Sequence, residues 1–260
     1  MDARIRDMTP DDTYYVSTCS HVHESDEIDA CGRARAAWLR EAWARGARVK
    51  VALVGGRQVG LIYLLPIEAC PWGPLGEGLM VIPCLFVQQR WTGGGLGRAL
   101  LDAVEEETRR QGRGGIVAEA FHHDSWFMPA SFFERHGYVE VHRRSTAALL
   151  WKPFAPTIAP PRPLEPRYVF EPVPGKVAVD LFWQTFCETS WIEAQRVREV
   201  SAEFGDAVAL REYPVDDRAV LLRHQIPRAI YVNGRQIDWG YEAPREGIRE
   251  AISRALEAQE

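Results

Sequence analysis

A proline-dense segment at Trp151–Lys176, WKPFAPTIAPPRPLEPRYVFEPVPGK, constrains the fold of this chain more than any other feature. Each proline removes a backbone N–H donor and fixes φ, so neither a helix nor a central strand can continue through it. We therefore expect an extended linker over residues 153–175, with a domain of residues 1–152 before it and a domain of residues 176–260 after it. The length of 260 residues agrees, since a typical domain has about 150.

The charge balance argues against several classes of partner. The chain has 31 Lys and Arg against 36 Asp and Glu, a formal net charge of −5, so it offers no bulk attraction to nucleic acid or to an anionic membrane. The first residues contain no apolar signal region, and no apolar stretch is long enough to span a bilayer. These observations predict a soluble, unprocessed protein with neither nucleic acid nor membrane as a partner.

The cysteines point to a reduced compartment. There are five, and no two are spaced as CxxC, which fits neither a fully paired disulfide framework nor a zinc ribbon. The sequence therefore predicts a cytoplasmic protein without a metal site.

Hydrophobic periodicity before the linker predicts helices and strands in the order ααβββαβαβ. A hairpin is expected where two glycines separate two apolar stretches, and a glycine-rich turn is expected before the third helix. The expected elements are helices Asp11–Ser20 and Asp29–Arg45, strands Val49–Val54, Val59–Pro66 and Leu79–Val87, helix Gly97–Gln111, strand Gly115–Ala120, helix Ala130–His136 and strand Val139–Trp151.

After the linker, hydrophobic periodicity predicts the order βαβαββα. Asn233-Gly234 is a strong signal for a type I′ hairpin turn between the last two strands. The expected elements are strand Lys176–Trp183, helix Ser190–Phe204, strand Ala207–Tyr213, helix Asp216–His224, strands Ala229–Asn233 and Arg235–Trp239, and helix Pro244–Ala258.

The turn at Arg90–Arg98, RWTGGGLGR, lies between a strand and a helix. Glycines there expose successive N–H groups at a helix N-terminus, where the helix dipole also favours a bound diphosphate. The Lys-Ser/Thr pair of a P-loop is absent, and a hairpin rather than a βαβ unit precedes the turn. The turn therefore predicts an anion site of another class.

Over about residues 1–152 the chain resembles the GNAT acyltransferases. Arg90, Gly93 and Gly95 match the family's (Q/R)-x-x-G-x-(G/A) motif, and residues 131–138, SFFERHGY, resemble its later YEKLGF segment. The resemblance implies an α/β fold with a mixed central sheet, and acetyl-CoA as cosubstrate. It implies that the pyrophosphate binds at Arg90, Gly93, Gly94, Gly95, Leu96, Gly97 and Arg98, and that the pantetheine amides pair with Leu85, Phe86 and Val87 of the preceding strand. One departure is Phe133, which stands where many members carry the tyrosine that protonates the departing thiolate.

A GNAT-like reaction needs a base that takes a proton from the attacking amine. Glu77 and Glu119 are expected near the point where the strands splay, and His122, His123 and Asp124 follow the strand that carries Glu119. Each carboxylate has the alternative of facing solvent, and only one of the two histidines can readily face a substrate. Glu68 flanks the same connection as Glu77, Cys84 is expected to pack, and Trp72 and Trp126 are candidates for a substrate mouth or for the core.

The second domain resembles the thioredoxin fold, and the whole chain resembles the YoaP-like acetyltransferases. Cys187 is expected at a helix N-terminus, which favours the thiolate, and Ser190 occupies the position of the second redox cysteine. The resemblance implies a cis peptide at Ile226-Pro227 facing Cys187. Cys187 is therefore a candidate nucleophile, with a purely structural position as the alternative.

Together these features predict an acetyl-CoA-dependent N-acyltransferase acting on a small-molecule or peptide amine, with catalytic candidates Glu77, Glu119, His123 and Cys187. The second domain is expected to assist substrate recognition. The alternative is a non-catalytic GNAT scaffold that senses a thiol, a soft metal or a CoA species through Cys187.

Overall fold

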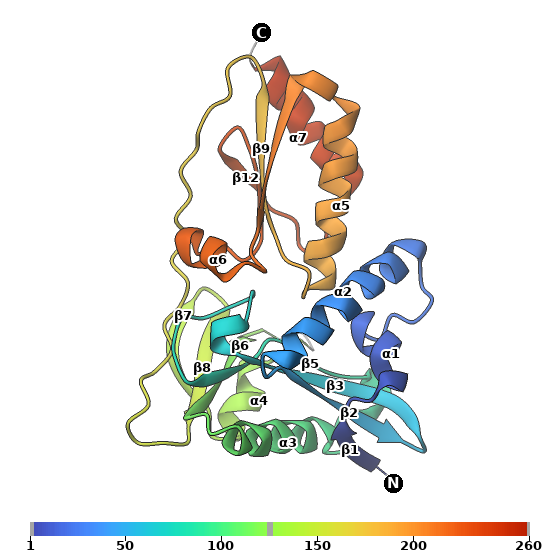
Figure 1. The fold of residues 1–260 in the computed structure, drawn as a ribbon, viewed down its shortest axis with the longest axis vertical. Coiled ribbons are helices and arrows are strands. Elements are labelled where there is room, and N and C mark those ends of the chain that lie inside the picture. Colours follow the sequence, from blue (N-terminus) through green and yellow to red (C-terminus); the bar gives the residue numbers. More distant parts are fainter. Residues whose placement is uncertain (1–2, 124–126, 259–260) are drawn as a thin grey trace. The chain divides into compact units, whose positions relative to one another are not determined.

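A computed structural model describes residues 3–123 and 127–258, which divide into two compact units (Figure 1). Unit 1 comprises Met1–Val22 and Ala36–Leu164, and unit 2 comprises His23–Arg35 and Glu165–Glu260. The division at residue 164 falls inside the proline-rich linker. The assignment of residues 23–35 to unit 2 has no counterpart in the sequence pattern, which places them in a helix of the first domain.

Unit 1 is built on an eight-stranded mixed sheet in the order β1-β2-β3-β4-β6-β8-β7, with β5 paired to β3. β4 and β6 are parallel, and the other pairs are antiparallel. The mixed central sheet expected of the first domain is thus confirmed. Its strands are β1 (Ala3–Asp7), β2 (Arg48–Val54), β3 (Arg57–Pro66), β4 (Leu79–Ile82), β5 (Leu85–Val87), β6 (Gly115–Phe121), β7 (Val139–Arg144) and β8 (Ala147–Pro153).

Helices cover both faces of this sheet. Ile62 and Leu64 of β3 join Leu100 and Val104 of α3 in one buried cluster. Tyr63 lies on the opposite face, where its hydroxyl donates to Val16 O of α1 at 2.6 Å. The helical segments are η1 (Pro10–Asp12), α1 (Thr13–Ser17), α2 (Asp26–Ala44), η2 (Ile67–Ala69), η3 (Gln89–Trp91), α3 (Leu96–Arg110) and α4 (Ala130–Arg135).

Three strand predictions differ from the structure. β1 was not expected, because its sequence ARIRD has little apolar content and pairs only at the sheet edge. The expected strand Val139–Trp151 is two strands, since Ser145 adopts φ 54° and reverses the chain. The expected strand Leu79–Val87 is interrupted at Pro83 and Cys84: β4 pairs with both β3 and β6, whereas β5 pairs with β3 alone.

Unit 2 has the expected order βαβαββα. Its sheet runs β10-β9-β11-β12, with β9 and β10 parallel and the other pairs antiparallel. Helices α5 and α7 pack on one face through Val197 and Ile252, which share a buried cluster with Val179 of β9. The elements are β9 (Val177–Trp183), α5 (Glu188–Glu203), η4 (Gly205–Ala207), β10 (Val208–Pro214), α6 (Arg218–His224), β11 (Ala229–Val232), β12 (Arg235–Ile237) and α7 (Arg245–Glu257).

The linker is anchored by side chains. Tyr168 stacks on Tyr231 with ring centroids 3.7 Å apart, and its hydroxyl donates to the buried carboxylate of Asp180 at 2.7 Å. Arg211 holds the same carboxylate through two hydrogen bonds. The part of the linker that follows residue 164 is therefore fixed on unit 2. Among the residues that the structure describes, no helix has the length and apolar character that crossing a bilayer requires.

Candidate functional site

The parallel strands β4 and β6 separate after a short paired stretch. Their register ends at Ile82 opposite Ala118. The chain then passes through Pro83 into β5, which pairs with β3, while β6 continues beside β8 to Phe121. Within the described residues, the edge of β5 that faces away from β3 has no strand partner. The backbone groups of this edge can pair with an extended ligand. The residues of β5, Leu85, Phe86 and Val87, are half-buried, whereas all of β4 is buried.

The glycine-rich turn follows β5 directly. Gly93 and Gly95 adopt φ values of 78° and 82°, a conformation that side chains with a Cβ rarely take, and Gly95 is the N-cap of α3. The helix begins its hydrogen-bond ladder with Ala99 N donating to Gly95 O at 3.0 Å. The amides of Leu96–Arg98 precede that bond, so no carbonyl of their own helix accepts from them. Gly93–Gly95 are exposed, which leaves this helix N-terminus open to an anion.

Two arginines flank the turn. Arg90 is exposed and donates to Gln88 Oε1 at 3.1 Å. Arg98 is exposed and lies 3.5 Å from Asp102 of the next helical turn. Both are surface contacts that contribute little to stability, so either guanidinium is free to turn towards a phosphate.

Glu119 is the carboxylate placed at the strand separation. It follows Ala118, the last residue of β6 that pairs with β4. The side chain is half-buried, and burial raises its pKa, although a hydrogen bond from the side chain of Trp72 opposes that rise. A partly buried carboxylate with a raised pKa suits the role of a general base. The structure thus brings together two residues that the sequence had named for separate roles.

Glu77 lies at the wrong end of the strand pair. The carbonyl of the neighbouring Gly78 accepts a hydrogen bond from Gly114 N at 2.9 Å. Gly114 lies just before β6, and at about 3.3 Å per strand residue it is about 16 Å along the strand from Glu119. The expectation that Glu77 borders the strand separation is therefore wrong. Glu68 lies at the same far end, where Arg113 binds both of its oxygens. Burial would raise the pKa of Glu68, but Gly78 N–H and Arg113 hold it below its usual value.

The two adjacent histidines face different neighbours. His123 is exposed and stacks on Phe121 with ring centroids 5.4 Å apart, on the face of β6 that carries Glu119. His122 faces the other way, and its Nε2 lies 2.9 Å from Glu140 Oε2. His123 therefore remains a candidate on the Glu119 face. Asp124 and Trp126 lie outside the described residues.

Phe133 is a core residue. It is fully buried and packs edge-on against Phe132 and Tyr138, with ring centroids 5.2 and 5.4 Å away. Its surroundings are apolar, so this position supplies no proton to a leaving thiolate. Cys84 is half-buried between β4 and β5, and its carbonyl accepts from Tyr63 N at 3.0 Å.

In unit 2, Cys187 is the N-cap of α5, as the sequence predicts. It is half-buried. Arg228 lies close to it. Burial alone would lower the pKa of Arg228, but its hydrogen bonds to Glu193 and the Coulombic attraction of Glu193 and Cys187 raise it. The Arg228 Nε to Glu193 Oε2 distance is 2.8 Å. No local sequence pattern predicts that Arg228 approaches Cys187, because the two are brought together by the pairing of β11 with β9.

One detail around Cys187 differs from expectation, and the nearby Ser190 has a structural role. The structure has no cis peptide among the described residues, so the expected cis bond at Ile226-Pro227 is wrong. The Oγ of Ser190 accepts from Gln184 N at 3.0 Å and so closes the loop before α5. Gln184 Nε2 also donates to Pro227 O at 3.2 Å, which keeps that proline beside the loop.

Comparison with known proteins supports the reading of the first unit. Residues 45–140 match the family model described as an acetyltransferase (GNAT) domain. This stretch contains the strand separation, the glycine-rich turn and Glu119. A comparison with curated proteins finds no match.

Solved structures show more distant likenesses. A protein from Desulfovibrio desulfuricans assigned to the GNAT family is 21% identical, with a TM-score of 0.47, and the match covers 59% of this chain and 99% of that one. The PaiA N-acetyltransferase from Thermoplasma acidophilum, in complex with coenzyme A, is 15% identical over 59% of this chain and 99% of that one, with a TM-score of 0.44. A Salmonella typhimurium protein with its cofactor acetyl-CoA is 19% identical over 62% and 98%, with a TM-score of 0.45.

Proposed function

We propose, from the acetyltransferase (GNAT) domain at residues 45–140, that the protein transfers an acetyl group from acetyl-CoA to an amine of a small molecule or peptide. The observation that carries the proposal is the exposed, glycine-capped N-terminus of α3 directly after the unpaired edge of β5. The helix N-terminus can bind the diphosphate of coenzyme A, and the adjacent strand edge can pair with its two amide groups.

In this proposal the pyrophosphate accepts hydrogen bonds from the amides of Gly93–Arg98. The helix dipole adds a favourable interaction with its charge, and Arg90 and Arg98 supply cations at the rim. The pantetheine arm lies along Leu85–Val87 and directs the thioester towards the strand separation at Ala118. The half-burial of β5 supports this route, because a strand that borders a ligand groove is partly accessible before the ligand binds.

The chemistry follows from the position of Glu119. The amine attacks the thioester carbonyl, so a C–N bond forms and the C–S bond breaks. Glu119, directly or through a water molecule, accepts the proton that the amine loses. The departing thiolate takes its proton from solvent, because Phe133 has no proton to give. The indole of Trp72 holds the carboxylate in place through its hydrogen bond.

We assign unit 2 to substrate recognition, as a thioredoxin-like domain of the YoaP type. Its βαβαββα order and the half-buried Cys187 at the start of α5 support this assignment. Arg228 beside the sulfur gives that part of unit 2 a positive group for an anionic or thiol-bearing portion of the substrate.

The test is release of thiol from acetyl-CoA by the full chain in the presence of a library of amines. The proposal expects release that depends on one class of amine and an acetylated product of the corresponding mass. Binding of acetyl-CoA without amine-dependent release across the library would contradict acyl transfer and favour the sensing alternative.

Cys187 is expected to react with limiting iodoacetamide faster than the other four cysteines. Cys31 and Cys70 are fully buried, whereas Cys19 and Cys84 are half-buried like Cys187. Cys187 caps the N-terminus of α5, whereas Cys19 follows α1 and Cys84 lies between β4 and β5. Labelling over pH 5–9, read by mass spectrometry, compares the five thiols in one sample. Arg228→Gln is expected to slow Cys187 and to leave Cys84 unchanged. Equal rates for Cys187 and Cys84 in the unaltered protein would mark the residue as structural.

A further inference from the structure

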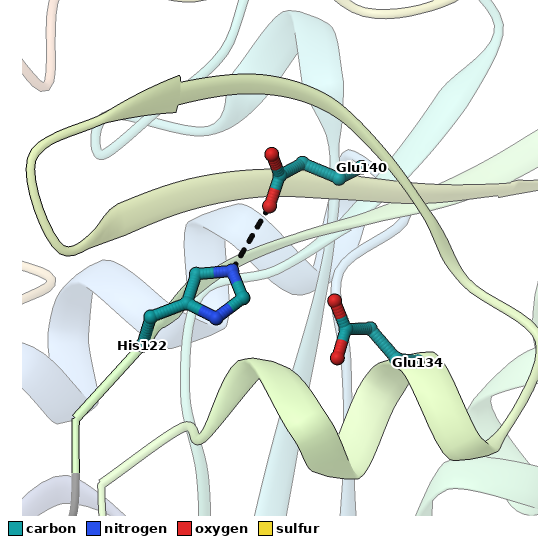
Figure 2. A group of neighbouring side chains, drawn as sticks. All are labelled: His122, Glu134 and Glu140. Atoms are coloured by element: carbon teal, nitrogen blue, oxygen red, sulfur yellow. Dashed lines mark hydrogen bonds and ion pairs between the residues drawn. The ribbon is translucent and has the colours of Figure 1, made fainter.

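Three polar side chains of unit 1 converge outside the proposed acyl-transfer site (Figure 2). His122 follows β6, Glu134 lies on α4 and Glu140 lies on β7. One ligand atom from each lies within 4.8 Å of the others, and the His122 Nε2 to Glu140 Oε2 distance is 2.9 Å. Figure 2 shows all three side chains pointing towards a common point. The sequence pattern predicts no such site, because the three positions share no motif.

The backbone around the three residues is fixed. His122 N donates to Thr146 O at 2.8 Å, which extends the pairing of β6 and β8 to this residue. Glu140 lies opposite Leu150 in the β7–β8 ladder. The donor groups therefore come from the end of β6, from β7 and from α4, and both strands pair with β8 in one folded unit. Little backbone entropy is therefore lost when they bind a common ligand.

The charges at this point favour a cation. The carboxylates of Glu134 and Glu140 both lie near His122. Arg143 is a cation beside them, and its guanidinium donates to Glu140 at 2.8, 3.0 and 3.1 Å. Arg143 is half-exposed, and an exposed ion pair of this kind contributes little to stability. The Arg143 guanidinium can therefore turn into solvent when a metal ion binds the carboxylates.

We propose that His122, Glu134 and Glu140 bind a divalent transition-metal ion of the zinc type. Zinc takes imidazole nitrogen and carboxylate oxygen at about 2.0–2.2 Å, which puts tetrahedral ligand atoms about 3.4 Å apart. The 2.9 Å pair has to open slightly, and the wider pairs have to close from 4.8 Å or less, both within the reach of side-chain rotation. One nitrogen and two oxygens favour zinc, cobalt or manganese over magnesium, which prefers oxygen alone. Three protein ligands leave a fourth position for water.

The site is separate from the proposed acyl transfer. Glu119 and His122 differ by an odd number of positions along an extended strand, so their side chains lie on opposite faces of β6. Loss of the metal site is therefore expected to leave acetyl-CoA binding unchanged.

The experiment uses the full chain, stripped of metal with a chelator and titrated with Co²⁺. Cobalt bound by nitrogen and oxygen gives weak visible bands, whereas cobalt bound by thiolate also gives an intense near-ultraviolet band, so the five cysteines are distinguished directly. We expect one Co²⁺ per chain with visible bands alone. His122→Ala and Glu140→Gln are expected to weaken binding by at least about tenfold. His142→Ala, an exposed histidine of the same strand β7, is the matched control and is expected to bind like the unaltered protein.

Arg143→Gln is expected to change Co²⁺ affinity in the opposite direction from the ligand variants. If the metal replaces the guanidinium, removing it should tighten Co²⁺ binding by up to about fivefold. Circular dichroism without metal shows whether each variant is folded. The absence of visible bands from the unaltered protein would overturn the proposal. Equal weakening by His122→Ala and His142→Ala, or a near-ultraviolet thiolate band that persists in His122→Ala, would do the same.

Discussion

Gly95→Glu is expected to weaken binding of coenzyme A by about 100-fold or more, which corresponds to about 2.7 kcal/mol. Gly95 has φ 82° and caps α3, so a side chain there strains the turn that presents the helix amides. The new carboxylate also competes with the diphosphate for the same N–H groups. Titration calorimetry of the full chain with coenzyme A measures the loss.

Gly112→Glu is the matched control. Gly112 has φ 68° and follows the opposite end of α3, and at both glycines an added Cβ meets nothing within 4 Å. Both variants therefore carry a comparable backbone strain of about 1–2 kcal/mol. Thermal unfolding should show similar destabilisation of the two, with coenzyme A binding lost only in Gly95→Glu. Unchanged affinity in a folded Gly95→Glu variant would place the cofactor elsewhere.

Glu119→Gln is expected to lower kcat/KM for an identified amine by about 10²-fold to 10⁴-fold, the usual contribution of a general base. Glutamine has the same shape and can still accept the hydrogen bond from Trp72, so the variant removes the proton acceptor and keeps the packing. Initial rates of thiol release at several amine concentrations give kcat and KM separately. The loss should fall mainly on kcat if Glu119 acts in the chemical step.

The pH dependence follows from the direction of the pKa shift. Burial raises the pKa of Glu119 above its ordinary value, so kcat/KM of the unaltered protein should rise with pH as this carboxyl ionises. Glu119→Gln should lose this rise. Because the folded state holds this proton more tightly than the unfolded state does, ionisation of Glu119 lowers the free energy of unfolding as pH increases above 4.5. Glu119→Gln is therefore expected to raise the melting temperature at neutral pH while it lowers activity.

A residue with only a structural role would not show this opposition between stability and rate. Glu77→Gln is the control, since Glu77 is exposed and lies at the far end of β4. It should change neither quantity. If Glu119→Gln keeps the unaltered kcat/KM and pH profile, His123 or the substrate itself must take the proton.

The sequence by itself determined the features that depend on neighbouring residues. The prolines of residues 153–175 interrupt regular structure wherever they are placed, because each lacks a donor. Gly93 and Gly95 define the turn because few other residues adopt its φ values. The apolar residues of unit 2 predict the order βαβαββα, because the periods that distinguish a helix from a strand extend over only a few neighbouring residues.

Only the tertiary structure decided which distant residues meet. Glu119 and Glu77 look alike as carboxylates beside strands, and the register of Ile82 with Ala118 is what puts the first at the strand separation and the second at the far end. The pairs Glu119 with Trp72 and Cys187 with Arg228 depend on strand pairing and helix packing. So does the convergence of His122, Glu134 and Glu140 from three elements. Such contacts have no local sequence signal, because long-range register and packing are set by burial of the whole core rather than by any one segment.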